Sequence, residues 1–152
     1  MKIIEKDILT IEEGIICHQV NCMGVMGGGL ALAIRNKFPK VYESYKLLCD
    51  TTYKNNLFDL LGYVQFVAIN DKLTIANIFG QYNYGVGQKH TEYAALVTAC
   101  ENIQESTKNL IPSCPIYVPY KMGSDRGGGD WNVVKSILES YLPNAIICKL
   151  PE

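Results

Sequence analysis

The sequence predicts an α/β fold whose sheet is largely covered by helices. Short apolar segments with strand character alternate along the chain with amphipathic segments of helical period. Two of the apolar segments run into a glycine-rich loop, and each loop leads into a helix. No change of composition marks an internal boundary, so we expect a single domain over residues 1–152, long enough for one substantial core.

The expected strands are short runs of apolar, β-branched and aromatic residues bounded by turn signals. Gly14 opens one such run, "GIICHQVN", which has the character of a buried strand. The tripeptide "NDK" separates two β-rich runs and predicts a hairpin. The expected strands cover residues 2–8, 14–21, 57–69, 73–80, 115–120 and 144–150.

The expected helices carry apolar residues at intervals of three and four. Pro39 interrupts the first helical pattern, which then resumes as a second helix. Thr91 and Asp130 are the expected N-caps of the two later helices. The four helical segments are residues 30–38, residues 40–50, a segment carrying Leu96 to Ile103, and a segment carrying Val133 to Tyr141.

Composition and charge exclude several functional classes. Hydrophobic residues make up 48% of the chain and charged residues 19%, as in globular proteins. The net charge of -1 is unlike the basic balance of proteins that grip nucleic acid by its phosphates, so we expect no strong intrinsic nucleic-acid binding. No apolar run approaches the roughly 20 residues of a membrane span, and "MKIIEKD" lacks the features of a signal peptide. We expect a cytoplasmic protein with no membrane partner.

The six cysteines predict buried, reduced thiols rather than a disulfide framework or a zinc site. They are scattered along the chain without a C-x-x-C spacing, and His18 and His90 are the two histidines. Because no cluster of His, Cys and carboxylate residues has ligand spacing, we expect neither a metal ion nor a cofactor.

The two glycine-rich loops, "MGGGL" and "KMGSDRGGGD", predict a site for an anionic ligand. Each follows an apolar strand and precedes an amphipathic helix, and ligands of open α/β sheets bind at the carboxyl ends of the strands. Helix N-termini carry unpaired N–H groups that suit phosphate, and glycine lets a ligand approach the backbone closely. Neither a Walker A loop nor a G-x-G-x-x-G fingerprint is present. The alternative is that these glycines serve only tight turns.

Three stretches together resemble the macrodomain family: "DI" at residues 7–8, "VNCMGVMGGGLALAIRNKFP" at 20–39, and "VPYKMGSDRGGGDWNVV" at 118–134. The likeness is strongest to the Appr-1-p processing branch, which is related to terminal ADP-ribose protein glycohydrolase and to bacterial DNA ADP-ribosyl glycohydrolases. It covers essentially the whole chain and implies a three-layer α/β/α sandwich with a mixed central sheet.

The resemblance also implies a site for ADP-ribose. Asp7 would accept a hydrogen bond from the adenine amino group, with Ile8 beside it, and Asn21 would face the distal ribose. The first diphosphate loop would comprise Gly27, Gly28, Gly29 and Leu30, and the second Gly123, Ser124, Asp125, Arg126 and Gly127.

Three residues are candidates for catalysis. Asp125 would act as general acid or base at the anomeric carbon, and Asn21 or Asp125 would orient an attacking water. His18 matches a histidine of some ADP-ribose-1''-phosphate phosphatases. Each also has a structural alternative: a solvated carboxylate or an ion pair with Arg126 for Asp125, a turn cap for Asn21, and a satisfied buried histidine for His18.

The chain departs from the family pattern in two places. Relatives read G-C-G-L-A-G-G-x-W where this chain has "GSDRGGGDW", and the terminal glycohydrolases place their catalytic Asp-Arg about two residues nearer the tryptophan. Their nucleophilic lysine is matched here by Gln81 to Asn83, and Lys89 lies further along the same loop. Attack by water is therefore favoured over a Schiff base.

The leading hypothesis is an ADP-ribose-binding domain that hydrolyses an ADP-ribosyl adduct, O-acetyl-ADP-ribose or ADP-ribose-1''-phosphate. The alternative is a non-catalytic reader of ADP-ribose, and a generic nucleotide-binding or scaffolding domain is a third interpretation. The expected partner is ADP-ribose or an ADP-ribosylated macromolecule, and the expected oligomeric state is a monomer.

Overall fold

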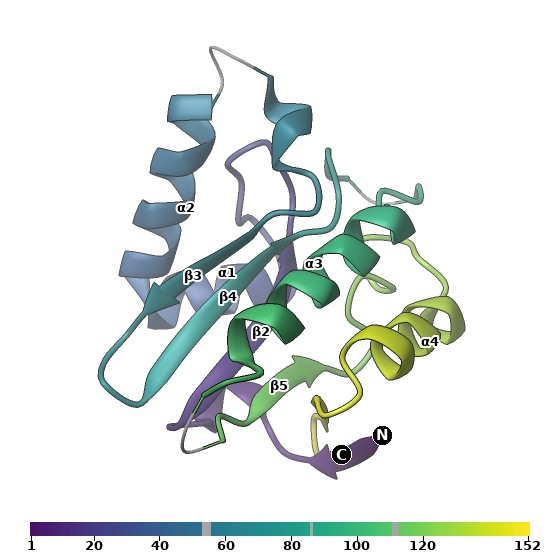
Figure 1. Cartoon of the computed structure of the whole chain (residues 1–152). Coiled ribbons are helices and arrows are strands. Elements are labelled where there is room, and N and C mark those ends of the chain that lie inside the picture. The colour runs from purple at the N-terminus through teal and green to yellow at the C-terminus, as the bar shows by residue number, and fades with distance from the viewer. Residues whose placement is uncertain (53–55, 86, 111–112) are drawn as a thin grey trace.

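The computed structural model describes residues 1–52, 56–85, 87–110 and 113–152. Within them, a six-stranded sheet has the order β1-β6-β5-β2-β4-β3 (Figure 1). The strands are β1 (Lys2–Glu5), β2 (Gly14–Val20), β3 (Val64–Ala68), β4 (Leu73–Phe79), β5 (Ile116–Pro119) and β6 (Ile146–Lys149).

The sheet is mixed because β3, the strand at one edge, runs antiparallel to the other strands. β1, β6, β5, β2 and β4 pair in parallel, whereas β3 pairs with β4 in the predicted antiparallel hairpin. The β2–β4 pairing is in register from Gly14 opposite Leu73 to Val20 opposite Phe79. β2 therefore lies inside the sheet with strands on both sides, and its side chains cannot avoid burial.

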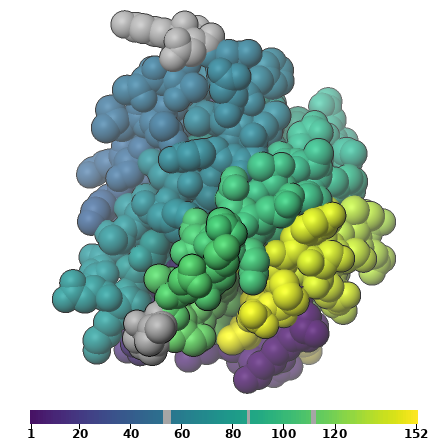
Figure 2. All heavy atoms as spheres, viewed as in Figure 1, coloured from purple at the N-terminus to yellow at the C-terminus, as the bar shows by residue number. Residues whose placement is uncertain are grey.

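Helices cover both faces of the sheet, which gives three layers. α1 (Gly29–Lys37) and α2 (Pro39–Thr52) pack on one face, and α3 (Tyr93–Thr107) and α4 (Trp131–Tyr141) pack on the other. In Figure 1, α3 and α4 cross in front of the sheet and α1 lies behind it. Figure 2 shows that α3 and α4 cover much of this front face. The α/β class and the mixed, helix-covered sheet expected from the sequence are confirmed.

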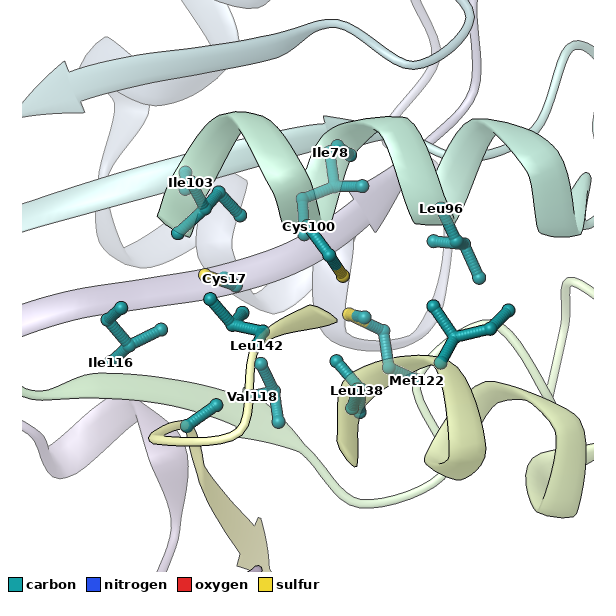
Figure 3. Packing of buried hydrophobic residues seen from close by; sticks show 14 of the residues in the cluster. Cys17, Ile78, Leu96, Cys100, Ile103, Ile116, Val118, Met122, Leu138 and Leu142 are labelled. Carbon is teal, nitrogen blue, oxygen red and sulfur yellow. The ribbon is translucent and has the colours of Figure 1, made fainter. Parts of the chain in front are cut away.

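The hydrophobic core is divided by the sheet into two clusters. Alternation along β2 sends Ile16 to the cluster under α1 and α2, and Cys17 to the cluster under α3 and α4. Figure 3 shows the second cluster, in which Leu96 and Cys100 of α3 and Leu138 of α4 pack over the strands. This alternation also decides which way His18 and Gln19 point at the end of β2.

The cysteines are free thiols, as expected from their spacing. Five are buried and Cys114 is half-buried. Burial raises the pKa of Cys22 and of Cys100 to about 12, so both stay protonated at neutral pH. Among the described residues, no group of three or more His, Cys, Asp or Glu side chains is placed to hold a metal ion. No described helix is long and apolar enough to cross a membrane.

Three local expectations were wrong. Residues 57–60 form a 3₁₀ helix, η2 (Leu57–Leu60), because Asn56 Oδ1 caps it by accepting from Phe58 N at 3.0 Å. The first strand ends at Glu5, and Asp7 caps a second 3₁₀ helix, η1 (Ile8–Thr10). Thr91 is not an N-cap, since Glu92 occupies that position and the Thr91 hydroxyl bonds elsewhere. Asp130 does cap α4, accepting from Asn132 N at 2.9 Å.

The topology places a crevice between β2 and β5. The chain leaves β2 toward α1 on one face, and it leaves the neighbouring β5 toward α4 on the other face. Two connections that part in this way open a crevice at the carboxyl ends of their strands. Both glycine-rich loops lie in these two connections.

Candidate functional site

A cavity of about 340 Å³ occupies this crevice between the two glycine-rich loops. Its floor is the end of β2, and its walls come from the start of α1, the end of β5 and the loop after β4. It is lined by residues 18–21, Val25, residues 27–31, Gln81, Tyr84, Gly85, residues 119–123 and residues 125–127.

Most of the predicted site residues line this cavity. The structure brings together His18, Asn21, Gly27, Gly28, Gly29, Leu30, Gly123, Asp125, Arg126 and Gly127. Asp7, Ile8 and Ser124 do not belong to its lining. Asp7 Oδ1 accepts from Leu9 N at 2.9 Å, and Ile8 is buried in the core under α1 and α2. The adenine contact expected of Asp7 stays a prediction.

Asn21 and Tyr45 fix the start of the first glycine-rich loop. Asn21 Oδ1 accepts from Met23 N at 2.9 Å, and its Nδ2 donates to Val25 O at 2.8 Å. The hydroxyl of Tyr45, on α2, lies 2.7 Å from Asn21 Oδ1 and accepts from the N–H groups of Gly24 and Val25 at 3.1 Å each. Asn21 therefore caps its own turn, and because Nδ2 carries two hydrogens, one of them is left for a ligand.

Arg126 joins the two glycine-rich loops across the cavity. A Cβ atom on Gly28 would lie 2.7 Å from Arg126 Cζ, and one on Gly29 would lie 3.2 Å from Arg126 Nε. The missing side chains of the first loop thus make room for the guanidinium group of the second. Among the described residues, neither Arg126 nor Asp125 forms a salt bridge, and both are exposed. The guanidinium can therefore serve as a bidentate anion donor.

The second glycine-rich loop rests on a cluster of buried polar side chains. Thr91 Oγ1 donates to Gly123 O at 2.6 Å and accepts from Gln19 Nε2 at 2.9 Å. A Cβ atom on Gly127 would lie 2.5 Å from Thr91 Oγ1, and Gly127 O accepts from Thr91 N at 3.0 Å. Gly127 therefore has a structural role, because any side chain there would collide with Thr91.

Gln19 is a cavity residue that sequence reasoning missed. Its Nε2 donates to Gln81 Oε1 at 2.7 Å as well as to Thr91 Oγ1, so it ties the cavity floor to the loop after β4. Two polar residues in succession, His18 and Gln19, inside an otherwise apolar strand are the signal that could have identified it. Gln81 is buried and accepts this hydrogen bond.

His18 is buried on the opposite face of β2, with 1% of its surface exposed. Its Nε2 lies 2.5 Å from Asn77 Oδ1 on the neighbouring strand β4. Burial lowers the pKa of His18 from 6.5 to about 4, and the hydrogen bond with Asn77 offsets only part of this shift. The imidazole is therefore neutral at pH 7.

The loop after β4 supplies an aromatic wall but no lysine to the cavity. Tyr84 lines the cavity and is half exposed, whereas Tyr82 stacks on Phe58 with ring centroids 3.8 Å apart. Lys89 Nζ lies 4.7 Å from the centre of the Tyr93 ring, at the start of α3, and Lys89 does not line the cavity. Val86 lies outside the described residues.

No protein-family model matches the chain. It is 29% identical over 143 residues to an uncharacterized 17.5 kDa protein of Enterobacteria phage T4, a match that covers 93% of this chain and 89% of the phage protein. It is 35% identical over 43 residues to the DNA ADP-ribosyl glycohydrolase of Mycobacterium tuberculosis, which covers 28% of this chain and 12% of the relative.

Solved structures resemble the whole chain. A macrodomain protein of Streptomyces coelicolor superposes with a TM-score of 0.78 at 22% identity and covers 99% of both chains. DarTG of Thermosipho africanus, solved in complex with ADP-ribose, superposes with a TM-score of 0.77 at 20% identity over 98% of this chain and 41% of that one. The macrodomain of M. tuberculosis DarG gives a TM-score of 0.76 at 21% identity over 99% and 97% of the two chains. At these identities the likeness shows the fold.

Proposed function

Because this chain has the macrodomain fold, we propose that it binds ADP-ribose in the cavity between its two glycine-rich loops and hydrolyses an ADP-ribose derivative there. The observation that carries the proposal is Arg126, whose guanidinium lies against Gly28 and Gly29 between the loops. A solved structural neighbour, DarTG of T. africanus, holds ADP-ribose, which supports the same ligand for this cavity.

The diphosphate of ADP-ribose would lie between the two loops. Its charge would be met by Arg126 and by the N-terminus of α1, which begins at Gly29 with no side-chain cap. The glycine backbone leaves space for phosphate oxygens at hydrogen-bonding distance from N–H groups. Asn21 would direct its remaining Nδ2 hydrogen to the ribose that follows the diphosphate.

For an ADP-ribosyl adduct, hydrolysis would take place at the anomeric carbon of that ribose. The bond from this carbon to the leaving group would break, and a water molecule would add its oxygen to the carbon. Asp125, an exposed carboxylate of the cavity lining, would take the proton from the attacking water or deliver one to the leaving group. The short match to a DNA ADP-ribosyl glycohydrolase supports this class of reaction. Since Lys89 packs on Tyr93, no step is assigned to it.

The second candidate function is a reader that binds ADP-ribose without turnover. It is favoured by the absence of any ion pair or hydrogen bond that would hold the Asp125 carboxylate in place, among the described residues. The two functions share the glycine-rich loops and Arg126 and differ only in the role of Asp125.

Calorimetric titration with ADP-ribose, ADP and NAD tests binding first. We expect saturable binding that prefers ADP-ribose, and an Arg126→Ala variant that binds about tenfold more weakly or worse. Arg35→Ala is the matched control, because Arg35 of α1 stacks on Tyr42 of α2, with its Cζ 3.8 Å from the ring centre. Equal affinity for ADP and ADP-ribose would contradict the proposal.

Turnover then separates the enzyme from the reader. Wild-type protein is incubated with an ADP-ribosylated oligonucleotide, an ADP-ribosylated peptide ester, O-acetyl-ADP-ribose and ADP-ribose-1''-phosphate, and released ADP-ribose is measured. In an enzyme, Asp125→Asn abolishes release while ADP-ribose affinity stays within about threefold. If wild-type protein releases no ADP-ribose from any of the four, the reader function stands instead.

A further inference from the structure

Asp125 and Arg126 are carried by a short segment, residues 124–126, that lies between Gly123 and Gly127. Both side chains are exposed, and neither forms a salt bridge among the described residues. Without such a partner, each side chain takes its place from the backbone that carries it. The position of Asp125 and Arg126 therefore depends on what holds the two ends of the segment.

Thr91 holds both ends of this segment. Its Oγ1 donates to Gly123 O at 2.6 Å, and its backbone N–H donates to Gly127 O at 3.0 Å. The packing is close, because a Cβ atom on Gly123 would lie 3.2 Å from Thr91 Oγ1, and one on Gly127 would lie 2.5 Å from it. Thr91 has no exposed surface, so bulk water does not compete for these two bonds.

The direction of each hydrogen bond around the Thr91 hydroxyl is fixed. Gly123 O can only accept, so the hydroxyl hydrogen points to it, and Thr91 Oγ1 accepts from Gln19 Nε2 at 2.9 Å. Gln19 Nε2 also donates to Gln81 Oε1 at 2.7 Å, and Gln81 Nε2 donates to Asn83 O at 2.8 Å. Because this chain of bonds has a main-chain oxygen at each end, no member can reverse without losing a bond. The second glycine-rich loop is thereby tied to the loop after β4, which forms another wall of the cavity.

We infer that Thr91 is a positioning residue of the candidate site, which sets the place of Asp125 and Arg126 by holding both ends of the segment that carries them. The inference rests on the proposed function and adds to it a residue that acts without touching the ligand. Thr91 does not line the cavity, so its effect reaches the ligand only through the loop. A shift of the segment would move the Arg126 guanidinium away from Gly28, against which it lies.

Two substitutions of Thr91 separate the hydroxyl from the rest of the side chain. Thr91→Ala removes the bond to Gly123 O without adding bulk, whereas Thr91→Ser keeps a hydroxyl that can make it. We expect ADP-ribose affinity to fall about tenfold in Thr91→Ala and to stay within about threefold of wild type in Thr91→Ser. Ile103→Val is the control for stability alone, because it removes a methyl group from a fully buried side chain of α3. It should lower the free energy of unfolding and leave the affinity unchanged.

A double-mutant cycle with Arg126 distinguishes positioning from a merely structural role. If Thr91 acts by placing the guanidinium, Thr91→Ala in an Arg126→Ala background should weaken ADP-ribose binding by less than about threefold. The loss of unfolding free energy caused by Thr91→Ala should be the same in both backgrounds. Losses of affinity that add in full would contradict the inference.

NMR of the ligand-free protein tests the same inference without relying on ADP-ribose. In Thr91→Ala we expect the amide resonances of residues 124–126 to shift and their order parameters to fall, while Thr91→Ser resembles wild type. Unchanged order parameters in Thr91→Ala, or wild-type affinity for ADP-ribose, would overturn the role of Thr91 and leave ADP-ribose binding intact. A wild-type protein that binds no ADP-ribose would reject the proposed function, and the order parameters would still decide whether Thr91 holds the segment.

Discussion

Arg126 of the second glycine-rich loop lies so close to Gly28 of the first that a methyl group on Gly28 would stand 2.7 Å from its Cζ atom. Gly28 has an extended backbone, with φ of -160° and ψ of 168°, which any residue adopts. The backbone can therefore accept alanine at this position, but the guanidinium group of Arg126 would have to move. A substitution of Gly28 therefore tests the space that this glycine leaves for Arg126 and not its backbone flexibility.

We predict that Gly28→Ala weakens ADP-ribose binding about tenfold while leaving the free energy of unfolding nearly unchanged. The physical reason is displacement of Arg126, so the same substitution in an Arg126→Ala background should have little further effect. Calorimetric titration of wild type, the two single variants and the double variant completes this double-mutant cycle. Gly27→Ala adds a methyl group to the same loop without reaching Arg126, because its Cβ would meet only Val25 Cγ1, at 3.4 Å, so its loss should be unaffected by the Arg126→Ala background. Additive losses would show that the two residues act independently.

Asp7 offers a test of adenine recognition that spares the local fold. Asp7→Asn keeps an oxygen to cap η1 at Leu9 N, but its second terminal atom becomes a donor. If Asp7 accepts from the adenine amino group, this variant binds ADP-ribose about tenfold more weakly. It should bind the hypoxanthine analogue, which presents an oxygen in place of the amino group, better than wild type does. Unchanged preference between the two ligands would remove Asp7 from the site.

Tyr45 is expected to stabilise the first glycine-rich loop through its hydroxyl alone. Tyr45→Phe would leave the N–H group of Gly24 without its acceptor in a buried place and that of Val25 with only Asn21 Oδ1 at 3.5 Å, and should cost about 1–3 kcal/mol of unfolding free energy. Urea denaturation measures this loss. Tyr42→Phe is the control, since its hydroxyl reaches Gly24 O only at 3.5 Å and should contribute less than about 0.5 kcal/mol. Equal losses in the two variants would contradict the assignment.

The low pKa of His18 predicts a stability that depends on pH. The unfolded chain binds a proton at this residue near pH 6.5, whereas the folded protein binds it only near pH 4. Unfolding therefore takes up a proton between these values, and the stability from the neutral imidazole is complete above pH 6.5 and lost as pH falls to 4. The loss should approach about 3 kcal/mol. His18→Gln lacks this titration but keeps His90, so the difference in unfolding free energy between wild type and variant should shrink over this range. A constant difference would contradict the buried neutral state.

Much of the fold follows from local sequence patterns. Gly14 to Val20, Leu73 to Phe79 and the helix after Asp130 were predicted close to their observed bounds, because each combines a clear hydrophobic period with a turn or cap signal. Residues 57–60 were mistaken for strand because "LFDLL" is apolar. The Asn56 side chain caps a 3₁₀ turn there, and this local hydrogen bond competes with an extended strand conformation. The amino-acid composition of the segment does not show which of the two conformations is more stable.

The glycine-rich loops of the candidate site could be predicted from the sequence, but the polar side chains that hold them could not. Gln19 and Thr91 are 72 residues apart, and only the pairing of the folded chain makes the role of either visible. Thr91 resembled a helix cap because it precedes α3, but tertiary contacts use its hydroxyl on Gly123 instead. The same holds for His18, whose partner Asn77 comes from the strand beside it.

A chain of side-chain hydrogen bonds runs from His18 through Asn77 and Gln65 and ends at a main-chain oxygen, that of Ser44 in α2. Changing the side chain at position 44 would leave this acceptor in place, except for proline, which would break the helix. Displacing α2 by one residue of register, for example by an insertion before Ser44, would remove that oxygen from Gln65. Each amide along the chain would then be free to turn over, and the imidazole could exchange its tautomer. The position of one helix therefore sets the tautomer of a histidine on a strand that it does not hydrogen-bond directly.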